Sequence, residues 1–330
     1  MKRLLAFLLL LLAEGSEDRR IPVGGQAVIE GVLMKGPSRW GLSVRKPDGM
    51  IESESWNNRS WTSSMPWKLP VIRGVVTMVE MMTVGFRALD KSAQIAVGEE
   101  EKITAKEMFI TVAVAIFAVV GLFIALPLWL SDLAVKAWGL TPLGKNVLEG
   151  CLRGVVFIAY VAGIGLWSEI RQVFRYHGAE HKTINAYESG AVMTPENVRN
   201  FSRIHPRCGT SFLLIVVAVS IVVFSLAGAG SILWRIGSRV VLLPLVMGIS
   251  YEIIKWASCA GPAGRVLMAP ALSFQYLTTR EPDERQIEVA LASLETALGR
   301  KLVTPAEEPE CTIWENSRLL KRTSRPSKRK

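Results

Sequence analysis

The three histidines of this 330-residue chain lie in one short region. His177 and His181 are four residues apart in "RYHGAEHKTINAYESG", with Glu180 between them, and His205 follows in "RIHPRCGT", close to Cys208. Side chains four apart on a helix project from the same face, so two imidazoles can reach one metal ion. This spacing predicts a metal site.

The residue types favour zinc, because imidazole and thiolate together suit that ion among the common metals. A third ligand is needed beside His177 and His181, and the candidates, in order, are His205, Cys208 and Glu252. Binding by both histidines together with His205 and Cys208 would close the tetrahedron and make the site structural. Three protein ligands would leave room for an activated water. The alternative is that the histidines titrate freely and contact lipid headgroups.

Glu180 completes the pattern H-x-x-E-H, in which the histidines bind zinc and the glutamate activates water. Three further charged residues are candidates for an additional ligand or a polar site in the membrane: Glu252, Arg153 and Glu30. Carboxylates in apolar helices are functional candidates by default. For Glu252 the alternative is an ion pair with Lys255, and for Glu30 a carboxylate that is satisfied locally or exposed.

The composition indicates a membrane protein, because half of the residues are hydrophobic and the mean hydropathy is +0.29. Four apolar stretches are long enough to cross a bilayer, at about residues 108–131, 148–170, 208–234 and 240–259. Within the second, Glu149 and Arg153 are spaced as a helical ion pair. The predicted fold is an α-helical integral membrane protein of about four transmembrane helices, with a small β-rich N-terminal region and a C-terminal amphipathic helix.

Loop charges predict the orientation. The histidine loop at 171–207 is rich in Arg and Lys, whereas the connection at 131–145 has few of either. The positive-inside bias places this loop, the β-rich region, the C-terminal helix and both termini in the cytoplasm. The net charge of +10 comes largely from the final run "SRLLKRTSRPSKRK", which is expected to contact anionic lipid headgroups. No nucleic-acid-binding module is recognisable.

The chain divides into six segments. The hairpin signal is Pro47-Asp48-Gly49, between stretches that alternate roughly in polarity. The segments are an apolar leader or interfacial stretch (1–20), a β-rich region (21–68), an amphipathic or re-entrant helix with a linker (69–104), a four-helix membrane domain (105–260), a C-terminal helix (261–303) and a basic disordered tail (304–330).

Several long motifs together resemble the YqhQ-like family of bacterial membrane proteins: "VGGQAVIEGVLMKGP", "RGVVTMVEMM", "HGAEHKTINAYESG", "HPRCGTSF" and "TTREPDERQIEVALASL". The resemblance covers about residues 23–299. It implies a multi-pass protein of the bacterial inner membrane and a metal-dependent enzyme without an established substrate. The positions that match its metal motif are His177, Glu180, His181, His205 and Cys208.

Three functions follow from this sequence. The leading hypothesis is a zinc-dependent hydrolase of a membrane-associated peptide or lipid-linked substrate, with Glu180 as the catalytic base. The second is a membrane scaffold that binds a partner, pinned by a structural His/Cys zinc site. The third is a small transporter with Glu252 and Arg153 on a polar path, for which a homo-oligomer could supply more helices.

Overall fold

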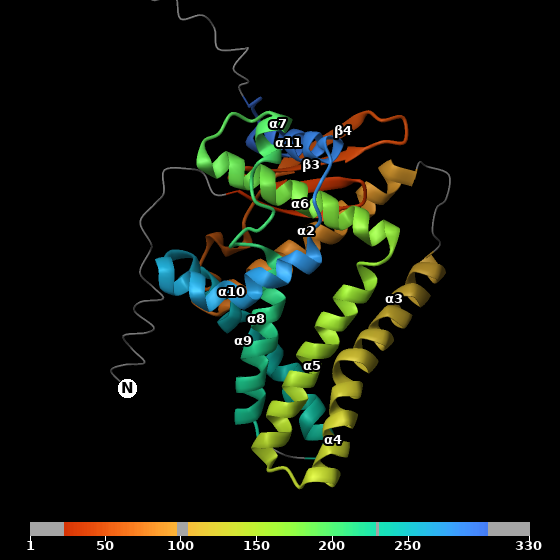
Figure 1. Ribbon diagram of the computed structural model, residues 1–330, viewed down its shortest axis with the longest axis vertical. Coiled ribbons are helices and arrows are strands. Elements are labelled where there is room, and N and C mark those ends of the chain that lie inside the picture. The colour runs from red at the N-terminus through yellow and green to blue at the C-terminus, as the bar shows by residue number, and fades with distance from the viewer. Residues whose placement is uncertain (1–22, 98–104, 229–230, 303–330) are drawn as a thin grey trace, which may run out of the picture.

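The computed structural model describes residues 23–97, 105–228 and 231–302. A helical bundle forms one half of the molecule, and a sheet covered by helices forms the other (Figure 1). The bundle consists of α3 (Ala105–Val120), α4 (Leu126–Trp138), α5 (Pro142–Ile164), α8 (Gly209–Leu226) and α9 (Ile232–Cys259). The predicted leader (1–20) and basic tail (304–330) lie outside the described residues.

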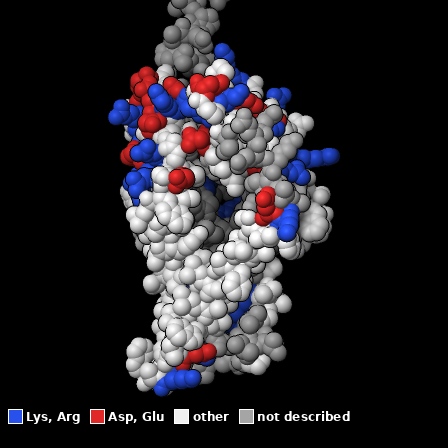
Figure 2. All heavy atoms as spheres, turned by 90° about the vertical axis from the view of Figure 1, so that its right-hand side faces the viewer, with Lys and Arg blue, Asp and Glu red and all other residues white. Residues whose placement is uncertain are grey.

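Four stretches of the bundle are long and apolar enough to cross a membrane: Phe109–Trp138, Leu143–Ile164, Gly209–Leu226 and Gly237–Ala257. They coincide with the four predicted spans. The first is longer than expected, because a π-helical turn (η2, Gly121–Ala125) joins α3 to α4 without a break. Charged side chains gather on the sheet half, and few show on the bundle (Figure 2).

One buried ion group ties the bundle together. Arg153 Nη2 on α5 donates to Glu149 Oε1 at 2.8 Å, which confirms the pair expected from the sequence. Arg239 on α9 donates to the same carboxylate at 3.0 Å, and Arg153 Nε donates to the carbonyl of Phe123 at 3.0 Å. A carboxylate removed from water needs such partners, so the group joins α5, α9 and η2.

The N-terminal region forms an antiparallel sheet in the order β1-β2-β3-β4. Its strands are β1 (Gly24–Val28), β2 (Gly31–Lys35), β3 (Arg39–Arg45) and β4 (Ile51–Asn57), followed by a short 3-10 turn, η1 (Trp61–Ser63). The Pro47-Asp48-Gly49 hairpin is confirmed between β3 and β4. Gly49 has φ +87°, which glycine adopts without a steric penalty.

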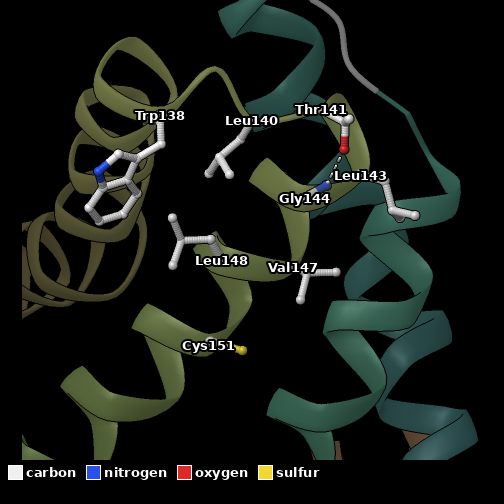
Figure 3. Close-up of a pocket in the computed structure, with 8 residues that line it drawn as sticks. All are labelled: Trp138, Leu140, Thr141, Leu143, Gly144, Val147, Leu148 and Cys151. Carbon is white, nitrogen blue, oxygen red and sulfur yellow. Dashed lines mark hydrogen bonds between the residues drawn. The ribbon is translucent and has the colours of Figure 1, made fainter.

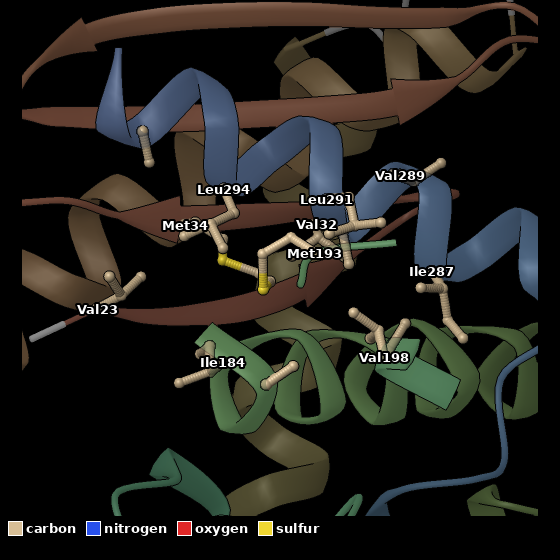
Figure 4. Close-up of a cluster of buried hydrophobic side chains, with 14 of the residues drawn as sticks. Val23, Val32, Met34, Ile184, Met193, Val198, Ile287, Val289, Leu291 and Leu294 are labelled. Carbon is tan, nitrogen blue, oxygen red and sulfur yellow. The ribbon is translucent and has the colours of Figure 1, made fainter. Parts of the chain in front are cut away.

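Helices cover both faces of this sheet. Val32 and Met34 of β2 pack towards α6 (Ser168–Ser189), α7 (Pro195–Arg199) and α11 (Glu284–Leu298) (Figure 4). Leu33, between them in sequence, packs with Leu42 on the other face, against α2 (Ile72–Val97). Successive side chains of a strand point to opposite faces, so one strand contributes to both cores.

The segment after the last span contains two helices where one was predicted. The first, α10 (Gly261–Thr278), is apolar but is not among the helices long enough to cross a membrane. The second is α11, with Asp283 as its N-cap. Asp283 Oδ1 accepts from Gln286 N, and Gln286 Oε1 accepts from Asp283 N. This capping box fixes where α11 begins, and Gly299 ends it.

Candidate metal centre

Three potential ligands meet where α6 passes the beginning of α8. His177 and His181 project from one face of α6, and Cys208 precedes α8. One ligand atom from each of these residues lies within 4.8 Å of the others. His177 Nε2 is 3.2 Å from Cys208 Sγ, and the two imidazole centroids are 4.4 Å apart. The structure therefore brings together two imidazoles and a thiol, a donor set that suits zinc.

Backbone carbonyls orient both imidazoles. Nδ1 of His177 lies 2.9 Å from the carbonyl oxygen of Thr278, at the end of α10, and Nδ1 of His181 lies 2.6 Å from that of Arg203. A carbonyl can only accept, so each Nδ1 carries the proton and each Nε2 is left with a lone pair. Metal-binding histidines commonly have such a partner, because it fixes the tautomer and the direction of the ring.

Cys208 is the N-cap of α8, and its Sγ accepts from Thr210 N at 3.4 Å. Burial would raise the pKa of the thiol, but hydrogen bonding and charge interaction with His181, together with bonds to Thr210, outweigh burial and lower the pKa. A helix N-terminus favours the thiolate in the same direction. Burial lowers the pKa of His181, against the opposing effect of its hydrogen bond to Cys208.

Glu180 lies beside the three ligands and is almost completely buried. Among the described residues, its Oε2 has no hydrogen-bond partner. Burial raises its pKa to about 8, against the opposing effect of His177. Strand β1 covers the carboxylate: a Cβ on Gly25 would lie 3.0 Å from Glu180 Oε1 and 2.6 Å from the carbonyl oxygen of Leu33, so glycine suits this close approach.

Two of the predicted ligands lie outside this group. His205 Nε2 is 3.5 Å from Glu188 Oε2, and its ring centroid is 5.7 Å from that of His181. Glu252 on α9 accepts from Arg73 Nε at 2.7 Å, so this carboxylate is paired with the beginning of α2. In the structure Cys208 therefore takes the place beside the two histidines for which His205 was the first candidate.

The two remaining candidates have structural partners. Arg153 belongs to the buried ion group of the bundle. Glu30 lies in the turn between β1 and β2 with φ +47°, and its Oε2 accepts from Tyr176 Oη at 3.1 Å and from Gln172 Nε2 at 3.4 Å. Burial and the nearby Glu30 carboxylate raise the pKa of Tyr176, so the phenol stays protonated and donates. Glu30 thus fastens the sheet to α6, next to His177.

Sequence reasoning did not find the groups that support the ligands: Gly25, and the carbonyls of Thr278 and Arg203. The "VGGQ" glycines were the only available signal for the close approach of β1, since a backbone carbonyl has no signature in a sequence.

An open apolar pocket lies at the other end of the bundle, at the turn between α4 and α5 (Figure 3). Its volume is about 530 Å³, and its lining includes Trp138, Leu143 and Cys151. A second cavity, of about 420 Å³, lies between α7 and the beginning of α11. Neither is lined by His177, His181 or Cys208.

Comparisons with known proteins agree with the resemblance seen in the sequence. A family model described as "Protein of unknown function (DUF1385)" matches residues 69–300. The chain is 31% identical over 292 residues to "Uncharacterized protein YqhQ" of Bacillus subtilis (strain 168), covering 83% of this chain and 92% of that protein. No solved structure matches. The matched residues contain all three members of the metal group, and the chain belongs to the DUF1385 family.

Proposed function

We propose that this protein is a zinc-dependent hydrolase that acts at the membrane surface on a membrane-associated peptide or lipid-linked substrate. The observation that carries the proposal is the buried Glu180 carboxylate, whose Oε2 has no partner among the described residues, beside His177, His181 and Cys208. An unpaired buried carboxylate is costly to keep, and a ligand at the adjacent site would supply the missing partner.

The three protein ligands match the number found in catalytic zinc sites, where the fourth position belongs to water or substrate. Bound zinc would lower the pKa of a coordinated water to ~7. Glu180 would accept the proton at Oε2 and later return it to the leaving group. Burial raises the pKa of Glu180 to about 8 in the metal-free protein, and the positive charge of a bound zinc ion would lower it again, towards the range in which a general base works at neutral pH.

The position of the ligands supports a membrane-associated substrate. Cys208 is the residue directly before the candidate span Gly209–Leu226. The chain leaves the span Leu143–Ile164 only a few residues before α6, which carries both histidines. A scissile bond in a headgroup or in the first extramembrane turn of a peptide would lie at this level.

A second candidate function has its own support. His181 and Cys208 are buried, as the ligands of a zinc centre that stabilises a scaffold for a partner would be. In that case Glu180 would neutralise the site rather than move a proton. The transporter alternative stays a prediction. Its two residues belong to separate ion pairs: Glu252 with Arg73 and Arg153 with Glu149.

Cobalt substitution distinguishes the two candidates without knowledge of the substrate. The purified protein is loaded with Co²⁺, and its visible spectrum is followed while acetohydroxamate, a small chelating probe of open metal positions, is added. The hydrolase proposal predicts a sulfur-to-cobalt band that disappears in Cys208→Ser, and a spectrum that responds to the probe. Full loading with a spectrum indifferent to acetohydroxamate would establish the closed, structural site instead.

Variants of the two carboxylates provide the control. Glu180→Gln should keep one metal ion per chain by elemental analysis and change the response to the probe, because the group beside the open position is altered. Glu188 lies near His205 but outside the group of His177, His181 and Cys208. Glu188→Gln should therefore change neither the metal content nor the response to the probe. Loss of metal in Glu180→Gln would make Glu180 a ligand and end its role as a base.

A further inference from the structure

Helix α2 leaves a row of apolar side chains exposed along one side. Its members are Ile72, Val79, Met82, Phe86 and Leu89, and Phe86 is 66% exposed. Their spacing of seven, three, four and three residues keeps them on a single face of the helix. The opposite face is already occupied, because it packs against the sheet. We call the exposed row the outer face of α2.

The segment before α2 extends this apolar surface. Trp61, Met65, Trp67 and Leu69 are all exposed, although large side chains of this kind are usually buried in proteins surrounded by water. Tryptophan is enriched where a membrane meets water, because its ring is apolar and its N–H is polar.

The beginning of α2 packs directly against α9, part-way along that helix. A Cβ on Gly248 would lie 2.4 Å from a methyl group of Val71, and a Cβ on Gly74 would lie 2.7 Å from Tyr251 Cβ. The two backbones therefore touch. Gly248 lies nine residues before Ala257, the end of the candidate span, which is ~13 Å along the helix at 1.5 Å per residue. The start of α2 is thus level with the part of α9 that would face lipid.

The outer face becomes polar towards the other end of the helix. Asp90 and Gln94 follow Phe86 at four-residue intervals on the same side, and Gln94 donates to Asp90 at 3.0 Å. In Figure 1, α2 runs obliquely across the end of the bundle, beneath the sheet. An apolar start and a polar end on one face are the pattern of a helix that leaves a membrane surface obliquely.

We propose that residues 61–72 and the outer face of α2 are a membrane anchor in the leaflet next to the metal centre, which begins in the acyl region at the start of α2 and rises along the helix to the headgroup boundary. The occupant is lipid, because the anchor is continuous with the bundle and begins at the depth of its spanning helices. α2 does not cross the bilayer, since Arg73, Glu80 and Arg87 interrupt its apolar sequence. The proposal does not depend on the hydrolase function.

The anchor also contacts strand β1, which covers Glu180 at the metal centre. A Cβ on Gly85 of α2 would lie 2.6 Å from Gln26 Nε2, and Gly25, the preceding residue of β1, packs against Glu180. Strand β1 is therefore held between the membrane-facing helix and the carboxylate of the site. The membrane surface thus fixes the position of the strand that covers Glu180.

Spin-label accessibility tests the anchor in the full-length protein. In a background with Cys151, Cys259 and Cys311 replaced by serine, and with the buried Cys208 kept, single cysteines are placed at Phe86 and at Gln94, the matched control on the same side. Phe117 in α3, which is 81% exposed in a candidate span, gives the lipid reference. Collisions with oxygen, which concentrates in lipid, and with a water-soluble nickel chelate are measured in vesicles of phosphatidylcholine and phosphatidylglycerol.

We expect the oxygen-to-nickel collision ratio at Phe86→Cys to approach that at Phe117→Cys, and to exceed that at Gln94→Cys several-fold. Equal ratios at positions 86 and 94 would place the outer face in water and overturn the proposal. Shielding of position 86 from both reagents, with spin–spin broadening that grows with the protein-to-lipid ratio, would show that a second copy covers it, which also overturns the proposal.

Discussion

Gly178, between the two histidines of α6, offers the sharpest test of the site geometry. A Cβ at this position would lie 2.1 Å from the carbonyl oxygen of Arg280, whereas ordinary contact begins at 3.4 Å. In Gly178→Ala the residues after α10 would have to move away from α6 by about 1.3 Å. They cannot do so freely, because Arg280 N donates to the carbonyl of Phe174 at 2.8 Å. Thr278, whose carbonyl orients His177, is the last residue of α10 and lies two residues before Arg280, so this movement would disturb it.

Two effects compete in this variant. Alanine is favoured over glycine inside a helix by roughly 0.5–1 kcal/mol. Overpacking costs typically ~1–3 kcal/mol, and loss of the group that orients a metal-binding histidine lowers metal affinity about 10- to 100-fold. The steric effect is larger than the gain in helix propensity, and it lowers both the stability of the protein and its affinity for metal. We therefore expect Gly178→Ala to melt at a lower temperature and to bind zinc at least tenfold more weakly.

Competition for Zn²⁺ with a chromophoric chelator measures the affinity, and tryptophan fluorescence on heating measures the stability. Gly163→Ala is the matched control, because a Cβ on this glycine near the end of α5 meets no atom within 4 Å. The control should bind zinc normally. If Gly178→Ala bound zinc as tightly as the unchanged protein and melted no lower, the contact between α6 and Arg280 would be refuted, and with it the placement of His177.

Three further predictions concern the bound metal, the packing of the sheet against α11, and the ion pair between Arg73 and Glu252. Removing zinc with a chelator should lower the melting temperature of the unchanged protein but not of Cys208→Ser, since a ligand at 100 times its Kd stabilises by ~2.7 kcal/mol. Gly41→Ala should destabilise the protein by ~1–3 kcal/mol, measured by heating, because the new Cβ would lie 2.4 Å from Ala297 N on α11. Arg73→Ala should cost ~3–5 kcal/mol by leaving the Glu252 carboxylate buried without its partner, whereas Arg73→Met with Glu252→Leu should recover most of the loss. Equal melting temperatures of the Arg73→Ala variant and the double variant would contradict this account.

The parts of the fold that depend on periodicity were predictable. Long apolar runs, two of them free of charge, marked the four candidate spans, and Pro47-Asp48-Gly49 marked a hairpin, because bilayer thickness and turn geometry act on residues close together in sequence. The four-residue spacing of His177 and His181 likewise determined that they would share a face of α6.

The parts of the fold and of the site that depend on tertiary contacts could not be predicted from the sequence. Proximity in sequence made His205 the first candidate for the third ligand, yet the turn that enters α8 directs Cys208 to the histidines and leaves His205 near Glu188. For Glu252 the sequence offered a functional carboxylate or an ion pair with Lys255, and it gave no sign of the ion pair with Arg73, which is far away in sequence. Contacts between distant segments have no period, so neither arrangement could be derived from spacing.

The positions of His177, His181 and Cys208 in the chain also determine when these three residues can come together during synthesis. Its ligands come from helices on either side of a loop, and the carbonyl that aims His177 belongs to Thr278, beyond the fourth span. The ribosome must therefore complete every spanning segment, and α10 after them, before the two imidazoles are held in place. Under the zinc proposal, metal loading would therefore be a late event in biogenesis. It would mark chains whose four candidate spans are complete and separate them from chains that stopped part-way.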